Sequence, residues 1–366
     1  MKNLSVIVPF YNAERCIEDC INMLLKQTLD NYEVILINDG STDQSLAICQ
    51  RFINDDRIKL INKLNSGAWD TRNVGIENSN GNYIMFIDCD DRFSPEWLEK
   101  MYREITESKT DLVISGQYDW IVTSGKKDKY QKVIVKEEYF LNNQSFLSNV
   151  LKLREMHVGD VLWNKIYRAD IIKENNIRFN NFRRSEDVDF NLQYYHYVNK
   201  CKVVEIYEYF YRVESNNPPW KKYGENYYKL VEDEYSFIRT RLNEWCLLDK
   251  ESLQIQSKYL INGLIDYIRG LILYEKQSYK FILNYMNEVL NREYFQEALN
   301  SYNDQSILIS LFVACLRNHN LYLSLGVIYI KIVGKWIKDK IRKLSIRDYI
   351  NNRKVVKQIE EMLSNY

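Results

Sequence analysis

Short apolar runs alternate with helical patterns over the first third of the chain. Residues 4–10, 33–38 and 83–88 have the length and composition of buried strands. A helical pattern over about 13–27 separates the first two runs, and residues 69–78 form another before the third. Because strands that alternate with helices pair in parallel through right-handed crossovers, this pattern predicts a doubly wound α/β sheet.

Polar residues follow the predicted strands. Residues 39–41 form a turn after the second strand, and Thr42 is placed to cap a helix that reaches about Phe52. Residues 59–62 supply a further strand. Ligands of doubly wound sheets bind beyond the carboxyl ends of the strands, so we expect the site among these polar residues.

The remaining two thirds of the chain fall into two regions. Residues 112–213 are mixed in pattern, and 207–212 read as a last strand. Consecutive prolines at Pro218-Pro219 end both helix and sheet, so we place a domain boundary between residues 217 and 218. From 218 to 366 the pattern is mostly helical.

The composition narrows the class of protein. The chain has 366 residues, of which 46% are hydrophobic, and its 50 basic residues balance 50 acidic ones. The zero net charge removes the usual electrostatic case for nucleic-acid binding by the whole protein and leaves only a local basic patch as an alternative. Seven scattered cysteines and three histidines favour neither a disulfide framework nor a zinc site, and they fit a reducing, cytosolic compartment. The apolar runs 307–316 and 321–333 are separated by a polar stretch, so no membrane span is predicted.

Three carboxylates occur within four residues in the run Asp88-Cys89-Asp90-Asp91, directly after a predicted strand. On an extended chain Asp88 and Asp90 project to the same side. Clustered carboxylates suit a hard cation such as Mg²⁺ or Mn²⁺, which would bridge to a phosphate. The alternative is an acidic turn that caps a helix near Pro95.

Four segments in order resemble glycosyltransferase family 2, whose catalytic domain has the GT-A fold. They read VIVPFYN over 6–12, NDGSTD over 38–43, RNVGI over 72–76 and FIDCDD over 86–91. Two later segments, WNK over 163–165 and EDVDF over 186–190, resemble the acceptor-side segment and the E-D-x-x-F motif of the family. The resemblance covers about residues 1–215 and fades after Pro219. It implies a GT-A domain over 1–217, with nucleotide-sugar binding in 1–110 and the acceptor side in 111–217.

The resemblance assigns donor-binding roles to residues that follow the strands. Pro9, Phe10 and Tyr11 would lie against the nucleotide base. Asp39 matches the carboxylate that accepts from the base ring N–H, which favours uridine because cytosine lacks that donor. Arg72 would contact the base or the diphosphate. For Asp39 a turn role, and for Arg72 a surface salt bridge, are the alternatives.

The same resemblance implies a metal and a general base. Asp88 would lie nearer the ribose, and Asp90, helped by Asp91, would hold Mn²⁺ or Mg²⁺. Asp187 is the candidate base that takes the proton of the acceptor hydroxyl, so that direct displacement inverts the anomeric centre. Asp189 is the alternative base, and the motif register favours Asp187. The alternative without a catalytic role is that both residues belong to the solvated, acidic first turn of a helix.

On the acceptor side, the resemblance names the residues Trp163, Asn164, Lys165 and Glu186. Trp163 would offer an apolar face to a sugar ring, or it belongs to the core, as aromatic side chains often do.

A basic amphipathic pattern occupies residues 328–347. Seven basic residues occur between 331 and 347 against the single acid Asp339. The pattern predicts either contact with an anionic membrane surface or a helix packed on the rest of the protein with its basic face in water. A lipid-linked acceptor would make membrane contact useful.

We therefore expect a cytoplasmic, membrane-peripheral, metal-dependent inverting glycosyltransferase that uses a UDP-sugar and acts in bacterial surface polysaccharide synthesis. The alternatives are a transferase that acts on a protein or a wall teichoic-type polymer, and a non-catalytic nucleotide-sugar-binding member. The helical region over 218–366 would serve membrane contact, oligomerisation or the acceptor site. The transferred sugar and the acceptor are not readable from the sequence.

Overall fold

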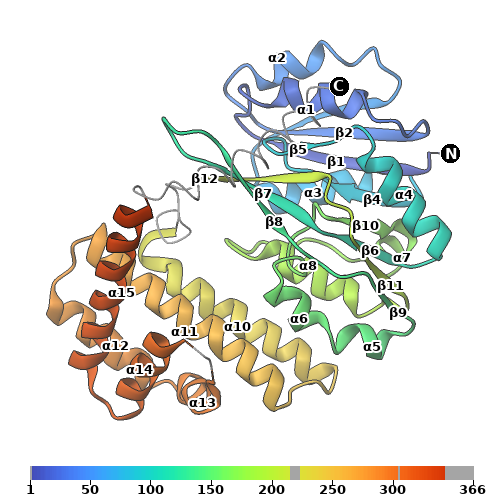
Figure 1. The fold of residues 1–366 in the computed structure, drawn as a ribbon. Helices are drawn as coiled ribbons and strands as arrows, with labels where there is room; N and C mark the ends of the chain where they lie inside the picture. Colours follow the sequence, from blue (N-terminus) through green and yellow to red (C-terminus); the bar gives the residue numbers. More distant parts are fainter. Residues whose placement is uncertain (1, 215–222, 304–305, 343–366) are drawn as a thin grey trace. The chain divides into compact units, whose positions relative to one another are not determined.

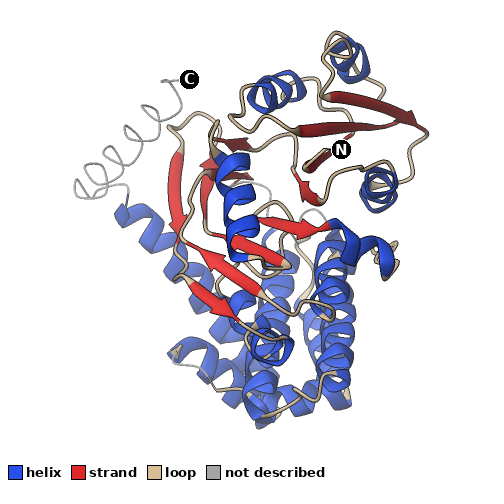
Figure 2. Cartoon of the chain, turned by 90° about the vertical axis from the view of Figure 1, so that its right-hand side faces the viewer, coloured by secondary structure: helices blue, strands red, loops and turns tan. Residues whose placement is uncertain are grey.

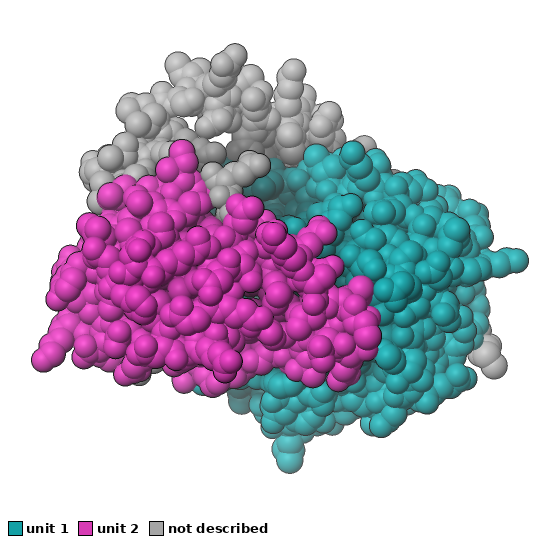
Figure 3. Space-filling view, turned by 90° about the horizontal axis from the view of Figure 1, so that it is seen from below, with its two compact units in different colours: residues 1–215, 354–366 teal, residues 216–353 magenta. Residues whose placement is uncertain are grey.

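The structure is a computed structural model that describes residues 2–214, 223–303 and 306–342. The chain divides into two compact units, which are coloured separately in Figure 3. Described residues up to 214 belong to the first unit, and those from 223 to 342 belong to the second. The predicted boundary at Pro218-Pro219 lies between them, outside the described residues. Figure 2 shows the strands of the first unit and the wholly helical second unit.

The first unit is built on an eight-stranded sheet with the order β3-β2-β1-β4-β10-β6-β11-β9. The first four strands in this order are mutually parallel, and β10 runs antiparallel to both its neighbours. The strands are β1 (Leu4–Phe10), β2 (Tyr32–Asp39), β3 (Ile58–Lys63), β4 (Tyr83–Phe86), β6 (Leu112–Ser115), β9 (Glu138–Phe140), β10 (Lys165–Arg168) and β11 (Cys201–Val204).

The central strands are buried because helices cover both faces of the sheet. All eight residues of β2 are buried, as expected of a parallel strand between two helical layers. Gly75 lets one helix, α3, approach β1 closely, since a Cβ there would lie 2.4 Å from Ile7 Cγ2. Figure 1 shows α1 and α2 together above β2. The helices of this unit are α1 (Ile17–Leu25), α2 (Ser45–Gln50), α3 (Ala68–Glu77), α4 (Trp97–Ser108), α5 (Asn143–Leu147), α6 (Val150–Glu155), α7 (Ala169–Glu174) and α8 (Glu186–Tyr195).

A second, four-stranded sheet in this unit has the order β5-β12-β7-β8. Its strands are β5 (Arg92–Phe93), β7 (Gln117–Val122), β8 (Lys129–Val133) and β12 (Tyr209–Glu214). β5 directly follows the acidic run 88–91, and it pairs with β12. This pairing brings the last strand of the unit next to the acidic run.

The second unit has its own hydrophobic core, formed by residues of all its α-helices. Asp249 and Ser252 form a capping box that fixes the start of the long helix α11. The elements are η1 (Gly224–Asn226), α10 (Tyr227–Glu244), α11 (Lys250–Leu273), α12 (Tyr279–Leu290), α13 (Glu293–Ser301), α14 (Ile307–Arg317) and α15 (Leu321–Arg342).

The predicted α/β class, a mostly parallel central sheet flanked by helices, and the helical second region are confirmed, with two corrections to helix starts. Within the sheet, β10 and β9 pair antiparallel with their neighbours. Helix α1 begins at Ile17, four residues later than predicted. Helix α2 begins at Ser45 with Gln44 at its N-cap position, so Thr42 does not cap it; the backbone N–H of Thr42 donates to Asn12 Oδ1 at 2.8 Å.

Candidate active site

The carboxyl ends of β1, β2 and β4 meet at one edge of the first sheet. β1 pairs with β2 on one side and with β4 on the other, so the strand order reverses across β1. Ligands of doubly wound sheets bind at such a point. The loops after β1 and β2 are tied together, because Asn12 N–H donates to Ser41 Oγ and Asn12 Oδ1 accepts from Thr42.

Three residues predicted to contact the base lie at the end of β1, with different exposures. Tyr11 is 51% exposed, Pro9 is half-buried, and Phe10 is buried in the core of the unit. The expectation for Phe10 is therefore corrected, because its ring packs into the protein. Tyr11 offers the open aromatic surface at this edge.

Asp39, the last residue of β2, is buried and held by three donors. Its Oδ1 accepts from Lys63 Nζ at 2.7 Å and from Ser66 N–H at 2.9 Å, and its Oδ2 accepts from Gly67 N–H at 3.0 Å. Burial alone would raise the pKa of Asp39, but these donors, led by Lys63, lower it. Asp39 is thus a fixed carboxylate whose Oδ2 keeps capacity for one more donor.

Arg72 joins the two acidic clusters that the sequence singled out. This residue of α3 is buried, with its guanidinium over the ring of Phe179 at 5.5 Å. Its Nη2 lies 3.3 Å from Asp88 Oδ1, and its Nη1 lies 3.3 Å from Asp187 Oδ1 and 3.4 Å from Glu186 Oε1. One cation therefore faces three carboxylates, and the site retains an excess of negative charge.

The E-D-x-x-F motif forms the first turn of α8, and its Phe190 explains how Asp187 reaches this place. The Phe190 ring stacks on Phe179 at 4.1 Å and meets Phe86 edge-on at 5.5 Å. Phe86 ends β4, two residues before Asp88. Residues 187 and 190 lie on the same side of a helix, so the aromatic packing directs Asp187 toward the end of β4.

The surroundings of Asp187 raise its pKa far above that of an ordinary aspartate. Burial raises its pKa to about 7, while Arg72 acts to lower it and Glu186 to raise it. Its Oδ1 is buried and accepts no hydrogen bond, although about a third of the side chain is exposed. Asp189 is buried instead, and its Oδ2 accepts from Asn180 Nδ2 and Gln193 Nε2, both at 2.7 Å.

The acidic run does not continue the strand. The chain turns at Cys89–Asp90, and Asp91 N–H donates to the backbone oxygen of Asp88 at 3.2 Å. Asp88 therefore faces Arg72, whereas Asp90 lies 3.6 Å from Arg212 Nη1. The expected extended arrangement of the two carboxylates is corrected, because the turn gives them different partners.

Asp91 holds β12 against this turn. It is buried, its Oδ2 accepts from Tyr209 OH at 2.6 Å, and its Oδ1 accepts from Arg212 N–H at 2.7 Å. Burial, with the charges of Asp88 and Asp90, raises the pKa of Asp91 well above its usual value. Because protein donors engage both oxygens, Asp91 is placed to position β12, and Asp90 is the open carboxylate of the pair.

Trp163 lies inside an aromatic stack and offers no surface of its own. Its ring is 3% exposed and stacks with Tyr209 at 4.7 Å and with Tyr211 at 4.9 Å. The core interpretation of Trp163 therefore holds.

Asn164 and Lys165 are fully buried, so the expectation that they contact an acceptor is corrected. Asn164 Nδ2 donates to the backbone oxygens of Ser115 and Val158. Lys165 Nζ donates to the backbone oxygens of Val158 and Val161 and to Asn164 Oδ1. Burial lowers the pKa of Lys165 to about 7.

Sequence reasoning missed Lys63 and three residues of β12, namely Tyr209, Tyr211 and Arg212. Lys63 lies at the end of β3, beside Asp39 in the register of the sheet. In β12 the two tyrosines Tyr209 and Tyr211 are two positions apart, so they lie on one face of the strand, and this spacing could have been read from the sequence. Their proximity to the acidic run depends on the β5–β12 pairing, which no local pattern encodes.

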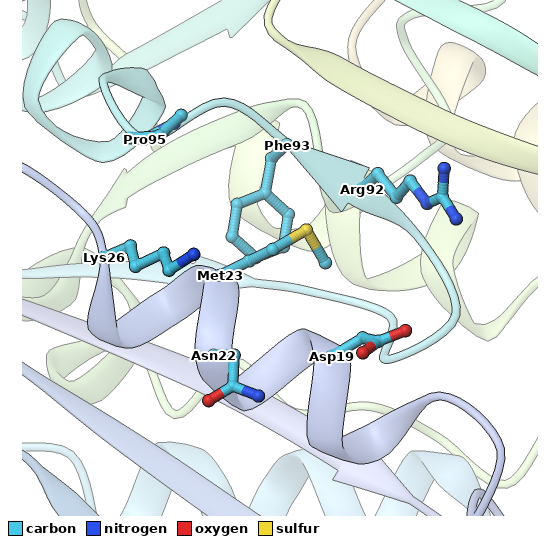
Figure 4. A pocket seen from close by; sticks show the side chains of 7 residues that line it. All are labelled: Asp19, Asn22, Met23, Lys26, Arg92, Phe93 and Pro95. Atoms are coloured by element: carbon cyan, nitrogen blue, oxygen red, sulfur yellow. The ribbon is translucent and has the colours of Figure 1, made fainter. Parts of the chain in front are cut away.

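A pocket of about 530 Å³ opens between α1 and β5 (Figure 4). Asp19, Asn22, Met23 and Lys26 line it from one side of α1, opposite Arg92, Phe93 and Pro95. None of the predicted site residues lines this pocket. The acidic cluster and this pocket are distinct features of the first unit.

Neither a ready-made metal-ligand cluster nor a membrane span is found among the described residues. In the part of the chain that the structure describes, no three His, Cys, Asp or Glu side chains form a group that could hold a metal ion. Within the same residues no helix is both long and apolar enough to cross a membrane. Helix α15 covers 328–342 of the predicted basic helix, but the side chains from 333 onward and residues 343–347 lie outside the described residues. Contact with a membrane surface stays a prediction.

Comparison with known proteins agrees with these motifs. Residues 5–175 match the model of Glycosyl transferase family 2. Glycosyltransferase GlyA of Streptococcus pneumoniae is 30% identical over 220 residues, which cover 58% of this chain and 31% of GlyA. Poly(ribitol-phosphate) beta-glucosyltransferase of Bacillus spizizenii is 28% identical over 250 residues, which cover 64% of this chain and 37% of that protein. The matches thus span about a third of each of these two relatives.

The fold resembles that of a solved structure. The crystal structure of S. aureus TarS 1–349 in complex with UDP-GlcNAc has a TM-score of 0.63 and 22% identity. The similarity covers 91% of this chain and 92% of the TarS chain. The likeness extends over both units and supports the GT-A type of the first.

Proposed function

Residues 5–175 belong to glycosyl transferase family 2, and from this premise we propose that the protein transfers a sugar from a nucleotide-diphosphate sugar to a hydroxyl of a glycan acceptor. The observation that carries the proposal is the position of Arg72. It brings Asp88, on the donor side, and Asp187, on the acceptor side, to one guanidinium at 3.3 Å each. Donor binding and base catalysis then share one site.

In this mechanism Asp187 is the general base. An acceptor hydroxyl becomes nucleophilic when a carboxylate begins to take its proton, and a base is most effective when its pKa lies near the working pH. The pKa of Asp187 near 7 meets this condition. Attack from the side opposite the leaving diphosphate breaks the sugar–phosphate bond and inverts the anomeric centre, while the proton moves to an Asp187 oxygen.

We propose that the donor is a UDP-sugar. Asp39 Oδ2 has room for one further donor, which the ring N–H of uracil supplies. Tyr11 offers an exposed ring at the same edge for the base. The TarS crystal structure with UDP-GlcNAc supports this class of donor by fold similarity.

A divalent ion, Mn²⁺ or Mg²⁺, fits this site at Asp90. About half of the Asp90 side chain is exposed, which makes it the most open carboxylate of the acidic run. The partial loss of water around its carboxylate and the Asp88 charge raise its pKa, a cost that a bound cation would offset. With no triad of protein ligands among the described residues, the ion would take its other ligands from water and the donor diphosphate, as Mg²⁺ commonly does. When bound, it would stabilise the charge that grows on the leaving diphosphate.

We propose a bacterial surface glycan as the acceptor. The two relatives described above come from bacteria, and one of them is a poly(ribitol-phosphate) beta-glucosyltransferase. That relative favours a polyol-phosphate wall polymer as the second candidate, beside capsular or exopolysaccharide chains.

Calorimetric binding of UDP and a panel of UDP-sugars, with Mn²⁺ and with a chelator, tests the proposal. We expect metal-dependent binding of UDP and tighter binding of one UDP-sugar. If no nucleotide sugar binds under either condition, the donor assignment is wrong.

A further inference from the structure

Tyr211 is the one open member of the aromatic stack that contains Trp163. Tyr209 is fully buried and Trp163 nearly so, whereas 36% of Tyr211 is exposed. Its ring lies close to parallel with that of Trp163, at an interplanar angle of 16°. One face of the Tyr211 ring thus packs on the Trp163 ring, while about a third of the residue is open to solvent.

The position of this ring is fixed relative to the acidic run. Tyr211 lies between the two β12 residues that Asp91 holds, since Tyr209 OH and Arg212 N–H both donate to the buried Asp91. A residue held on both sides by hydrogen bonds to one carboxylate has little freedom to move away from it. The Tyr211 ring is therefore held at a fixed place beside the acidic run.

Polar groups border the ring on the same side of the sheet. Tyr211 is the register partner of Asp119 in the neighbouring parallel strand β7, so the two side chains project to the same face. Burial and the charges of Asp88, Asp91 and Asp90 raise the pKa of the Tyr211 phenol, which keeps its hydroxyl protonated. The charge of Asp88 also acts on Asp187, so Asp88 is a common neighbour of the ring and the base.

From this arrangement we infer that Tyr211 is the platform for a pyranose ring at the reaction centre, a role that rests on the proposed glycosyl transfer. A pyranose has one face of C–H groups and a rim of hydroxyls. The C–H face packs on an aromatic ring, and the hydroxyls bond to carboxylate and phenol groups at its edge. Tyr211 supplies the ring, and Asp119 and the Tyr211 hydroxyl supply the polar edge. Trp163 supports the platform from behind.

The pyranose could come from the acceptor or from the donor, and two measurements on the full-length protein separate these sources. The first is saturation-transfer NMR with methyl β-glucopyranoside and its 2-acetamido analogue, in the presence of UDP and Mg²⁺. The second is calorimetry with UDP and UDP-GlcNAc. The variants are Tyr211→Ala, Tyr211→Phe, which keeps the ring, and the control Tyr197→Ala, which removes a tyrosine of similar exposure, 42%.

For an acceptor pyranose, we expect transfer from protein to the sugar ring protons in wild type, Tyr211→Phe and the control, and its loss in Tyr211→Ala, with UDP-GlcNAc affinity unchanged. For a donor pyranose, Tyr211→Ala would lower UDP-GlcNAc affinity about tenfold and leave UDP affinity unchanged. If Tyr211→Ala alters neither measurement, the platform assignment is overturned. Failure of wild type to bind UDP would instead refute the proposed function, and the glycoside measurement would still report on Tyr211.

Discussion

Arg72 acts to lower the pKa of Asp187, so its removal should shift the pH dependence of sugar transfer. The ion pair spans 3.3 Å from Nη1 to Oδ1. Two unit charges at this distance interact by about 1 kcal/mol in water and about 5 kcal/mol at an effective dielectric constant of 20. Because about a third of the Asp187 side chain is exposed, we take the smaller figure, which corresponds to about one pKa unit.

The direction of the shift follows from the role of the base. Asp187 works in its deprotonated form, so the wild-type rate should rise with pH and reach half its plateau near the pKa of about 7. In Arg72→Gln the midpoint should move to about pH 8 or above. At pH 7 the ionised fraction of Asp187 would then fall from about one half to about one tenth.

The assay is UDP release at saturating UDP-sugar, followed from about pH 6 to about pH 9. Saturation with donor removes any effect of Arg72 on donor affinity. Arg51→Gln is the matched control, because Arg51 makes an exposed ion pair with Glu18. An Arg72→Gln profile with the wild-type midpoint would refute the coupling between Arg72 and the base.

Four further variants test single residues. Asp90→Ala should abolish the Mn²⁺ dependence of UDP binding at an unchanged Tm. Asp91→Ala should lower the free energy of unfolding by about 2–4 kcal/mol in denaturant titration, because two buried donors lose their acceptor. Equal Tm values for Asp90→Ala and Asp91→Ala would contradict the assignment of a binding role to Asp90 and a structural role to Asp91. Asp187→Asn should keep UDP affinity and slow transfer about 10²–10⁴-fold, and full activity would exclude it as the base. Lys165→Met should lower the free energy of unfolding by about 2 kcal/mol, because buried carbonyls lose their donor. The pKa of Lys165 is lower in the folded protein than in the unfolded chain, so the free energy of unfolding of the wild type should rise between about pH 7 and pH 10. If the free energy of unfolding changes with pH equally in wild type and Lys165→Met over this range, the lowered pKa of Lys165 is wrong.

The parts of the fold that local patterns encode were predictable. β1 and β2 are continuous apolar runs, and both strands lie where the sequence placed them. Asp88 and Asp187 were singled out from their motifs, and the structure brings both to Arg72. The reason for this proximity, the packing of Phe190 on Phe86, involves residues about a hundred positions apart and has no local signature.

The differences arose where burial depends on distant segments. Lys165 looks like a solvent-exposed lysine in sequence, yet β10 pairs with β6, which comes about fifty residues earlier, and this pairing places Lys165 fully inside the unit. For Trp163 the sequence left a core and an acceptor role open, and Tyr209 and Tyr211, which come almost fifty residues later, cover it. Asp91 became an anchor because the pairing of β5 with β12 places two donors at its carboxylate.

We propose that donor and base meet at the edge formed by β1, β2 and β4. A crystal structure with a UDP-sugar and Mn²⁺ tests it most directly. We predict the uracil beside Tyr11 and Asp39, the diphosphate at Asp90, and the anomeric carbon facing Asp187. A nucleotide bound elsewhere, such as in the pocket between α1 and β5, would contradict the account.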